Sequence, residues 1–327
     1  MENNFDKSLY ELHYHHYKYC SKYKKIVDSL YSNIKDPEDI YLHSSIFKNH
    51  RLISNPNNHQ FQEYSSSGTS GKPSYIFFDR ADSVRQQKVL ISILRPYIPK
   101  EKNSIFLSIP FETSRNNARR AAERGFRLLS RKYETLSTDL ETCYLQIKKY
   151  ISDYKQVIIF GFTYELFLLF KKFEGLNLSP LESTNLYIIH GGGWKKLQNL
   201  SIDNKSFEDL LRRKLPRSHI LNYYGMIEQT GIIYPRCELG YYHFTDYSKI
   251  LIRGVDGVKL GPGARGMIQS ISILPRSYPG HSILTQDLGM IHQESKCKCG
   301  RNGKTFSVFG RLNKVEQRGC SDAYKTN

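Results

Sequence analysis

The sequence predicts an α/β fold: a mostly parallel sheet flanked by helices, followed by a smaller β-rich subdomain. Short apolar runs alternate with helical segments through the middle of the chain, a pattern typical of parallel strands that are covered on both faces. Beyond residue 235 the apolar runs lie closer together and are interrupted by glycine and proline, which is typical of a β-rich subdomain. The expected strands are 75–78, 105–109, 157–160, 186–189, 220–221, 250–253, 267–274 and 306–309, and the expected helices are 118–132, 141–151, 164–173 and 206–215.

The first 50 residues carry tyrosines at helical spacing, Tyr10, Tyr14 and Tyr17, and are expected to form one or two surface helices. A later amphipathic helix is expected to have Asp82 as its N-cap, since aspartate accepts hydrogen bonds from the free N–H groups of a first turn. Its apolar residues recur at the spacing of one helix face, so we expect them to point inward. They are Val89, Leu90, Ile93 and Leu94.

Composition limits the classes of protein to which this chain can belong. In 327 residues, 48 Lys and Arg stand against 31 Asp and Glu, and the net charge of +17 favours an acidic or polyanionic partner. The 13% aromatic content excludes intrinsic disorder. No apolar stretch reaches the ~20 residues of a membrane span, and the N-terminus lacks a signal-peptide pattern, so we expect a cytoplasmic protein with no membrane span. In that compartment the six cysteines are expected to be thiols or metal ligands.

Residues 66–72 form a segment rich in serine and glycine that is suited to holding phosphate groups. Glycines let the backbone approach an anion, and hydroxyls and a lysine supply hydrogen-bond donors. The segment is not a Walker A loop, because only Thr69 and Ser70 separate its glycines and Pro73 follows the lysine. A flexible surface loop is the alternative interpretation. The residues of the segment are Ser66, Ser67, Gly68, Thr69, Ser70, Gly71 and Lys72.

This segment resembles the phosphate-binding motif of adenylate-forming enzymes, and three later segments resemble further motifs of that superfamily in the same order. Asn222–Glu228 resembles the adenine-binding motif, Thr285–Gly289 the ribose-binding aspartate motif, and Gly310-Arg311 the arginine near the hinge. A narrower resemblance, from about residue 60 to the C-terminus, is to the acyl-protein synthetase (LuxE-type) family, with phenylacetate-CoA ligases as the next relatives. The segments that carry it are Gly191–Lys195, Tyr224–Gln229, Cys297–Arg301 and Arg318–Asp322.

The resemblance implies a ligase that uses ATP and Mg²⁺ to activate a carboxylic acid, with a fatty acid as the expected substrate. It implies that residues 66–72 hold the leaving β- and γ-phosphates. The backbone of Gly191 and Gly192 would lie along the nucleotide, and Tyr224, followed by Gly225, would stack on the adenine.

Three charged side chains complete the site that the resemblance implies. Glu228 would bind Mg²⁺, which prefers carboxylate oxygens, and Asp287 would accept hydrogen bonds from the ribose hydroxyls. Arg311 would supply positive charge near the ribose or the α-phosphate. Ile227 departs from the pattern, because many relatives have Thr or Ser there, so a hydroxyl contact to the phosphate would be absent. Without the resemblance, an alternative interpretation is that Tyr224 is an aromatic residue of the core and Glu228 a solvated carboxylate.

The C-terminal segment implies the fate of the activated acyl group. The chain ends at Asn327, soon after the hinge-like segment, so we expect the N-terminal domain of an adenylate-forming enzyme without its C-terminal lid. Cys320 matches the acyl-accepting cysteine of the family, and the basic residues of 296–318 should favour its thiolate. An unreactive thiol on a disordered tail is the alternative. The expected parts are an N-terminal helical segment 1–50, an α/β nucleotide-binding core 51–234, a β-rich subdomain 235–315 and a mobile tail 316–327.

Four other residues have the side chains of a zinc site. Three thiolates and one imidazole, from Cys237, His243, Cys297 and Cys299, are able to close a tetrahedral structural site. Some relatives among the phenylacetate-CoA ligases carry a similar set. Unligated thiols in a β-rich corner are the alternative, and Cys20 and Cys143 are expected to be packing cysteines.

The densest positive charge lies in 115–132, where Arg120, Arg124, Arg127 and Arg131 would share one face of a helix. A solvated helix face, a docking site for an acidic acyl-carrier protein or acyl-accepting enzyme, and nucleic-acid binding are the three interpretations. Nucleic acid is disfavoured because no sequence motif of a nucleic-acid-binding fold accompanies the cluster.

Three functions follow from the sequence. The first is an acyl-protein synthetase that forms acyl-AMP and transfers the acyl group to its own Cys320 for delivery to a partner. The second is a lidless ligase that transfers the acyl group to CoA, an acyl-carrier protein or an amine. The third is a non-catalytic binding protein with the adenylate-forming fold.

Overall fold

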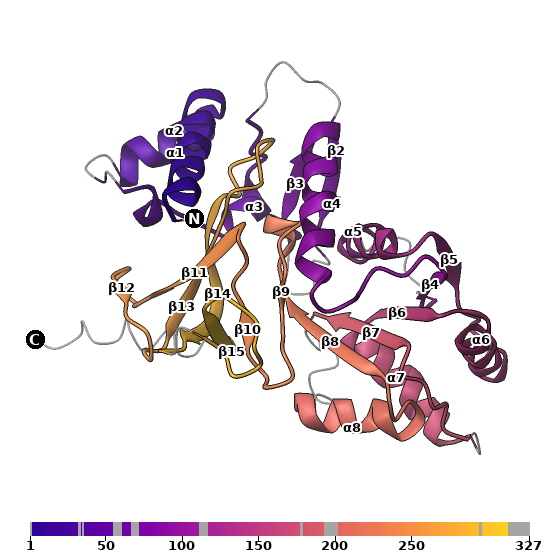
Figure 1. Cartoon of the computed structure of the whole chain (residues 1–327). Helices are drawn as coiled ribbons and strands as arrows, with labels where there is room; N and C mark the ends of the chain where they lie inside the picture. Colours follow the sequence, from indigo (N-terminus) through magenta and orange to yellow (C-terminus); the bar gives the residue numbers. More distant parts are fainter. Residues whose placement is uncertain are drawn as a thin grey trace, which may run out of the picture. The chain divides into compact units, whose positions relative to one another are not determined.

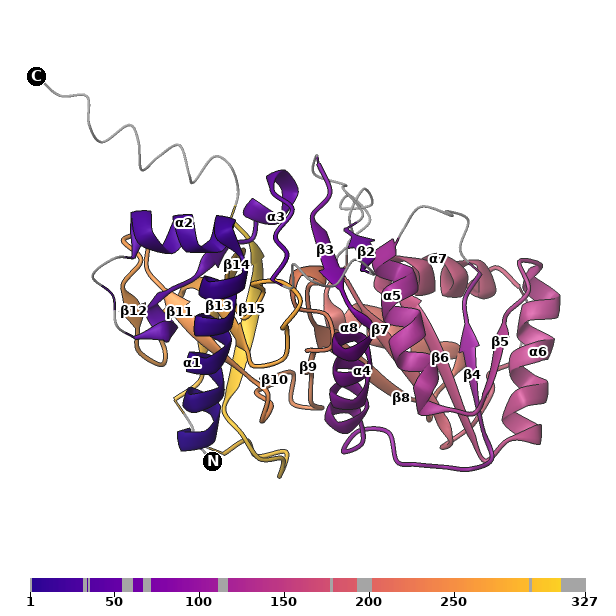
Figure 2. The same cartoon turned by 90° about the horizontal axis from the view of Figure 1, so that it is seen from above.

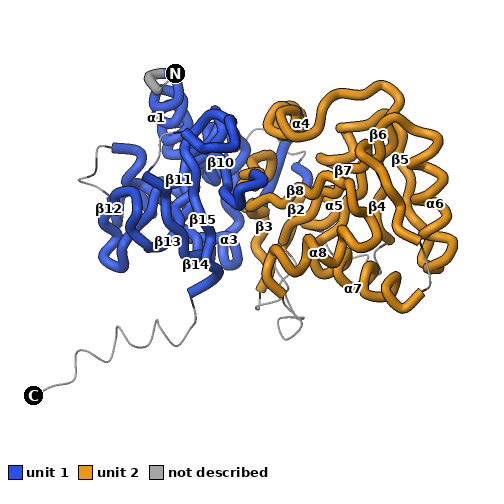
Figure 3. Tube along the Cα trace, turned by 60° about the horizontal axis from the view of Figure 1, so that its bottom comes forward, with its two compact units in different colours: residues 1–62, 76–82, 237–327 blue, residues 63–75, 83–236 orange. Residues whose placement is uncertain are grey.

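Figure 1 shows the computed structural model of the chain, which describes residues 2–31, 34, 36–54, 61–66, 72–110, 117–176, 179–192, 202–293 and 296–312. The chain divides into two compact units (Figure 3). Unit 1 contains residues 1–62, 76–82 and 237–327, and unit 2 contains residues 63–75 and 83–236. The N-terminal residues thus belong to the same compact unit as the C-terminal strands.

Unit 2 is built on a sheet with the strand order β5-β4-β6-β7-β8-β9. β5, β4, β6, β7 and β8 are parallel, whereas β9 pairs with β8 in the antiparallel direction. The strands are β4 (Ser104–Ser108), β5 (Lys132–Thr135), β6 (Gln156–Phe162), β7 (Leu186–Gly191), β8 (His219–Tyr224) and β9 (Tyr234–Pro235). The helices are α4 (Arg80–Leu94), α5 (Asn117–Phe126), α6 (Leu140–Asp153), α7 (Thr163–Glu174) and α8 (Asn204–Lys214), with short turns η2 (Arg127–Leu129) and η4 (Ile227–Gln229).

Both faces of this sheet are covered, as the alternating pattern predicts (Figure 2). On one face, buried side chains of α6, α7 and α8 join those of the strands in a single apolar core. On the other face α5 packs against the sheet, where the ring of Phe126 lies 5.0 Å from that of Phe160. The central strand β6 is buried along its whole length, which accounts for the apolar sequence that follows Gln156. The parallel α/β core is therefore confirmed.

The predicted C-terminal end of one helix is wrong. The helix expected over 118–132 ends at Phe126, and a short turn leads from it into the edge strand β5. The reason is that β5 is exposed along its length and carries charged side chains, so its sequence continues the polar pattern of the helix surface. Arg131 therefore lies outside the helix that was expected to present it.

Unit 1 is built on a second, largely antiparallel sheet with the strand order β10-β15-β14-β13-β11-β12, and β1 pairs with β14 in parallel. The expected strands at 250–253, 267–274 and 306–309 are confirmed as β11, β13 and β15. The strands are β1 (Leu42–His43), β10 (Tyr242–His243), β11 (Ser248–Arg253), β12 (Lys259–Leu260), β13 (Gly266–Ser272), β14 (Ser282–Ile291) and β15 (Thr305–Arg311). The other elements are α1 (Glu2–Tyr19), α2 (Ser21–Leu30), η1 (Pro37–Asp39), α3 (Ile46–Asn49) and, near the unit boundary, β2 (Gln62–Ser65) and β3 (Tyr75–Phe78).

Two helices were expected at most in the first 50 residues; α1 and α2 are these helices, and η1, β1 and the short α3 follow them before residue 50. α1 is anchored to the sheet of unit 1. Leu9 packs with Leu251 and Ile271 in one buried cluster. The buried His16 bonds through Nδ1 to the Ser54 hydroxyl at 2.8 Å and through Nε2 to the Pro275 carbonyl at 3.0 Å. In the part of the chain that the structure describes, no helix combines the length and the apolar character that crossing a membrane requires.

The prediction that Asp82 is the N-cap of α4 is also wrong. The helix begins at Arg80, and the side chain of Asp79 accepts the hydrogen bond from the backbone N–H of Asp82 at 2.7 Å. The carboxylate of Asp82 instead accepts hydrogen bonds from the backbone N–H groups of Arg276 and Ser277, each at 2.9 Å. Asp82 thus binds a distant loop instead of capping its own helix. The predicted inward-facing residues of α4 are all buried.

Candidate active site

The predicted nucleotide-binding residues of unit 2 lie where parallel strands end. β7 ends at Gly191 and β8 at Tyr224, and the two strands are neighbours in which Gly191 pairs with Tyr223. Open α/β sheets bind their ligands outside the carboxyl ends of the strands. The structure thus brings Gly191, Gly192 and Tyr224 together at the edge where this kind of fold binds ligands.

Two glycines at this edge are required by the backbone. A Cβ atom on Gly191 would lie 2.6 Å from the ring of Tyr223, so any larger residue would displace that ring. Gly192 has a φ angle of +77°, a left-handed conformation that side chains rarely adopt. Gly191 therefore permits the close approach of β7 and β8, and Gly192 permits the sharp turn that follows.

The segment after β8 carries the predicted adenine and metal residues. Tyr224 is half-buried and pairs with Tyr234 of β9, with ring centroids 6.2 Å apart. Gly225 is exposed, and the turn η4 that follows it contains the buried residues Ile227 and Glu228. The carboxylate of Glu228 is only 9% exposed, and burying a charge costs free energy unless it has a partner. Glu228 does have interaction partners.

The serine- and glycine-rich segment is described only at its ends. The backbone N–H of Ser66 donates to the carbonyl of Ser74 at 3.0 Å, and the N–H of Ser74 donates to the Ser66 hydroxyl at 2.8 Å. These bonds hold the two ends of the segment together, and Lys72 is exposed. Ser67, Gly68, Thr69, Ser70 and Gly71 lie outside the described residues.

A buried ion network supports the same edge of the sheet, and sequence reasoning missed it. Arg119 of α5 is 1% exposed, and its Nε donates to Glu165 at 3.1 Å. Its other nitrogens donate to Glu123 at 2.7 Å, to the Ser108 hydroxyl at 3.1 Å and to a backbone carbonyl just beyond β4. Glu165 also accepts a hydrogen bond from the backbone N–H of Phe162 at 2.7 Å. The network therefore joins α5 and α7 to the ends of β4 and β6.

We predict that Arg119→Ala will lower the free energy of unfolding by roughly 3–5 kcal/mol, because it leaves the buried carboxylate of Glu165 without its cation. Arg124→Ala is the matched control, since Arg124 lies on the same helix but is exposed. That control is expected to stay within about 0.5 kcal/mol of the parent chain. Chemical denaturation measures both values, and equal effects of the two substitutions would contradict the prediction.

The predicted basic surface is only partly a helix face. Arg120 and Arg124 are exposed on α5, whereas Arg127 lies in η2 and Arg131 follows it, both exposed. Because the helix ends first, the four side chains do not share one helical face. They remain four exposed positive charges on successive elements.

His190 of β7 is a second buried group that the sequence pattern did not single out. Its Nδ1 lies 3.0 Å from the Thr163 hydroxyl, and its ring lies 4.7 Å from that of Phe207. Burial, with a smaller contribution from the positive charge of Arg236, lowers the pKa of His190 to about 3. His190 is therefore neutral at physiological pH and acts as a packed polar group directly before Gly191.

An apolar cavity of about 150 Å³ lies beside these strand ends, entirely within unit 2. Its walls come from α4, α5, the ends of β6, β7 and β8, and the turn after β8. Thr230 also lines the cavity and is a polar residue among mostly apolar lining residues. Tyr223, Gly225, Met226 and Ile227 line it as well, so the cavity adjoins the predicted adenine segment.

In unit 1 the structure pairs two further predicted residues. Asp287 of β14 stands opposite Arg311 of β15, and Nε of Arg311 lies 3.5 Å from Oδ1 of Asp287. The arginine is 67% exposed and the aspartate 21%, so the pair is accessible to a ligand. Cys320 lies outside the described residues.

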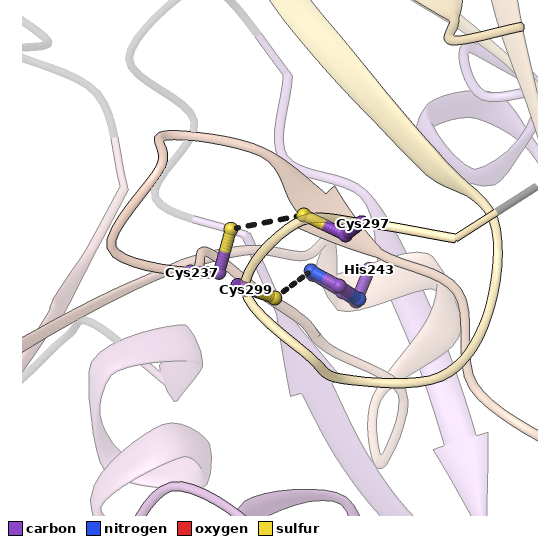
Figure 4. A group of neighbouring side chains, drawn as sticks. All are labelled: Cys237, His243, Cys297 and Cys299. Atoms are coloured by element: carbon purple, nitrogen blue, oxygen red, sulfur yellow. Dashed lines mark hydrogen bonds between the residues drawn. The ribbon is translucent and has the colours of Figure 1, made fainter. Parts of the chain in front are cut away.

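The four predicted zinc ligands also come together in unit 1 (Figure 4). Their ligand atoms lie within 4.8 Å of one another; the Sγ atoms of Cys237 and Cys297 are 3.9 Å apart, and Sγ of Cys299 is 3.4 Å from Nε2 of His243. A tetrahedral zinc with Zn–S bonds of about 2.3 Å separates two sulfurs by about 3.8 Å, whereas a disulfide needs about 2.05 Å. Nδ1 of His243 bonds to the carbonyl of Asn302 at 3.4 Å, which leaves the Nε2 lone pair for a metal. The residues present therefore fit zinc.

The fold, a parallel α/β sheet in one unit and an antiparallel sheet in the other, is that of adenylate-forming ligases of known structure. The model of the LuxE acyl-protein synthetase family matches residues 1–327, so the chain belongs to this family and is an ATP-dependent ligase. Over 96% of this chain and 85% of the relative, it is 25% identical to the long-chain-fatty-acid–luciferin-component ligase of Vibrio harveyi. The relative of the same name from Aliivibrio fischeri is also 25% identical, over 97% of this chain and 86% of the relative.

Solved structures confirm the fold. A 2-hydroxyisobutyryl-CoA ligase in an open conformation, in complex with 2-HIB-AMP and CoA, matches 93% of this chain and 73% of its own, with a TM-score of 0.70 and 15% identity. A long-chain-fatty-acid-CoA ligase from Archaeoglobus fulgidus matches 80% of this chain and 53% of its own, with a TM-score of 0.56 and 15% identity. The predicted fold class and family are thus confirmed.

Proposed function

We propose that this protein activates a carboxylic acid as acyl-AMP and transfers the acyl group to the thiol of Cys320. The observation that carries the proposal is the meeting of Gly191, Gly192 and Tyr224 at neighbouring strand ends, in a chain whose whole length matches the acyl-protein synthetase family. The two glycines leave the backbone free of side chains, so a nucleotide can approach the sheet edge. Tyr224 then offers a half-buried ring on which an adenine can stack.

The charged residues divide the work of adenylation. Glu228 would bind the Mg²⁺ that accompanies ATP, and the ion would offset the negative charge that gathers when a carboxylate approaches the α-phosphate. Asp287 would accept the ribose hydroxyls while Arg311, its neighbour at 3.5 Å, would add a fixed positive charge. Ser66 to Lys72 would hold the departing pyrophosphate.

The apolar cavity is the acyl site of this proposal. Tyr223 and Gly225 of the adenine segment line it, so an acid bound there would have its carboxylate near the nucleotide. The names of the curated relatives support a fatty acid as the substrate. We place the reaction in the cytoplasm, where ATP is available.

A partner is needed to take the acyl group from Cys320. An acidic acyl-carrier protein or an acyl-accepting enzyme fits a chain with a net charge of +17. The exposed arginines at 120, 124, 127 and 131 offer such a partner a positive surface.

Exchange of labelled pyrophosphate into ATP tests the activation step. We expect exchange that depends on an added carboxylic acid, since acyl-AMP formation is reversible. Mass spectrometry of the intact protein after incubation with acid and ATP tests the transfer step, and an increase by one acyl group is the expected result. Absence of exchange with every acid would refute activation, whereas exchange without acylated protein would favour transfer to CoA, a carrier protein or an amine.

We also propose that Cys237, His243, Cys297 and Cys299 bind a structural zinc ion. The fit of their spacing to tetrahedral geometry supports this, and four protein ligands leave no open position for catalysis. The ion would hold the turn before β10 against the loop between β14 and β15. Its role would be to stabilise unit 1.

We predict that the purified protein carries about one zinc per chain and that Cys297→Ser removes most of it. Loss of the ion should lower the melting temperature by roughly 5 °C or more. Elemental analysis and a thermal melt measure the two effects. Cys143→Ser is the control for zinc content, because Cys143 is a buried cysteine of unit 2 that does not belong to the cluster. Zinc at background level in the parent protein would contradict the proposal.

A further inference from the structure

The first turn of α7 contacts the end of β7, where the glycines of the proposed nucleotide site lie. The hydroxyl of Thr163 donates a hydrogen bond to the carbonyl of Gly191 at 3.3 Å. The oxygen of the same hydroxyl lies 3.0 Å from Nδ1 of His190. Because a threonine hydroxyl has a single proton, which here points to Gly191, Nδ1 of His190 carries a hydrogen and donates to Thr163. The three residues therefore form one chain of hydrogen bonds that ends on the Gly191 carbonyl.

The side chain of His190 makes only this hydrogen bond among the residues that the structure describes. The residue is 1% exposed, and the buried Nε2 has no hydrogen-bond partner in that part of the chain. A buried polar atom without a partner costs free energy, and an apolar side chain would pack against Phe207 without that cost. The presence of a histidine is therefore explained by the hydrogen bond that it donates to Thr163, and packing alone does not explain it.

The position of Thr163 is itself fixed by its surroundings. Thr163 is buried and directly follows Phe162, the last residue of β6, which pairs with Gly191 in the parallel sheet. Glu165 accepts hydrogen bonds from the backbone N–H of Phe162 at 2.7 Å and from Arg119 at 3.1 Å. These bonds hold the start of α7 at the end of β6, so the Thr163 hydroxyl is kept beside β7.

We infer that Thr163, oriented by His190, is a positioning residue for the nucleotide, because it fixes the carbonyl of Gly191 and with it the sharp turn at Gly192. Glycines have no side chain that restricts their backbone, and Gly192 has a φ angle of +77°. A hydrogen bond to the preceding carbonyl therefore restricts the backbone along which the nucleotide would lie. The inference rests on the proposed function, since it takes the two glycines to border the nucleotide.

Thr163→Val and Thr163→Ser test the inference. Valine has the shape of threonine without the hydroxyl, whereas serine keeps the hydroxyl. In the pyrophosphate-exchange assay Thr163→Val should raise KM for ATP at least fivefold, because it leaves the Gly191 carbonyl and Nδ1 of His190 without their partner. Thr163→Ser should stay within threefold of the parent protein. KM for the acid should change less than threefold in both variants, since Thr163 is not among the described residues that line the apolar cavity.

Thr138→Val is the matched control, because it makes the same chemical change at an exposed position of unit 2. It should leave KM for ATP and for the acid unchanged. Thermal melts of all three variants separate positioning from stability. A purely structural role would lower the melting temperature of Thr163→Val and leave KM for ATP unchanged in the folded protein. That result, or an equal rise of KM for ATP in Thr163→Val and Thr163→Ser, would overturn the inference.

His190→Asn and His190→Gln test the other end of the chain of hydrogen bonds. The amide nitrogen of asparagine can take the place of Nδ1, whereas that of glutamine extends toward the place of Nε2. We expect KM for ATP to stay within twofold of the parent value in His190→Asn and to rise at least threefold in His190→Gln. A rise in His190→Asn as large as that in His190→Gln would overturn the role of His190 as the donor to Thr163.

Direct binding distinguishes failure of this inference from failure of the proposed function. Calorimetric titration with ATP and Mg²⁺ measures Kd without any acyl transfer. A Kd at least fivefold weaker in Thr163→Val than in Thr163→Ser would support the positioning role even if no acid promoted exchange. Equal Kd values in the two variants would overturn the inference, and exchange by the parent protein would then leave the proposed function intact. Absence of ATP binding by the parent protein would refute both.

Discussion

Replacing Cys320 by serine should abolish the acyl label on the protein while acid-dependent pyrophosphate exchange continues at the parent rate. The reason is that activation and transfer use different groups. In the proposed mechanism acyl-AMP forms at the strand ends of unit 2, whereas the thioester would need a thiolate, which a serine hydroxyl cannot replace at neutral pH. The segment before Cys320 favours that thiolate, since 296–318 contains seven basic residues and one acidic residue. The expected loss of label is complete, at least 100-fold against the parent protein.

Cys143→Ser is the control for this experiment. Cys143 is fully buried in α6, and burial, with a smaller effect of Asp139, raises the pKa of its thiol to about 12. A thiol of this kind is protonated at physiological pH and does not react, so the control should keep its label. Loss of both label and exchange in Cys320→Ser would place Cys320 in the activation step, and retention of both would mean that the acyl acceptor lies elsewhere. Either result would contradict the proposed role.

The sequence was sufficient to predict the parallel core, because each strand and helix of that core can be recognised from its own short segment of sequence. The strands of that core are short apolar runs, and the helices between them have a regular apolar spacing. The four cysteine and histidine residues were predicted together as one metal-binding set, and the structure brings them together. Asp287 and Arg311 were predicted in two separate motifs, and only the structure shows that they pair. The edge strand β5 was missed because it is exposed and polar, so it has no apolar alternation by which to recognise it.

The supporting parts of the site were less accessible to sequence reasoning. Arg119 stands in a run of arginines, and nothing in the run indicates that this one side chain is buried on Glu165, 46 positions away. The cavity is lined by alanines of α5, which occur in any helix, and by residues of α4, β6 and β8 that are distant from them in the sequence. Such features arise from contacts between distant segments, so only the folded chain reveals them. The network of Arg119 is one such feature, and it ties α5 and α7 to the ends of β4 and β6.

Replacing Glu228 by glutamine should reduce pyrophosphate exchange by roughly 100-fold, which corresponds to about 2.7 kcal/mol in activation free energy. The substitution keeps the shape of the side chain and removes its charge, so the loss isolates the carboxylate from packing. In the proposed mechanism that charge binds Mg²⁺, and a neutral amide oxygen is a weaker ligand for this ion. Raising the Mg²⁺ concentration should therefore restore part of the rate, a response that a purely structural role would not produce.

Glu182→Gln provides the matched control, because it makes the same chemical change at an exposed position. Glu182 is 62% exposed and its ion pair with Arg217 is long, at 3.5 Å, so its removal should leave both stability and exchange unchanged. A thermal melt of Glu228→Gln checks that the protein remains folded, since an amide can keep one of the hydrogen bonds of a buried carboxylate. If exchange fell equally in both variants, or if Glu228→Gln lost activity without any response to Mg²⁺, the metal role of Glu228 would be refuted. Partial rescue by Mg²⁺ in Glu228→Gln alone would tie the buried carboxylate after β8 to the nucleotide-bound ion.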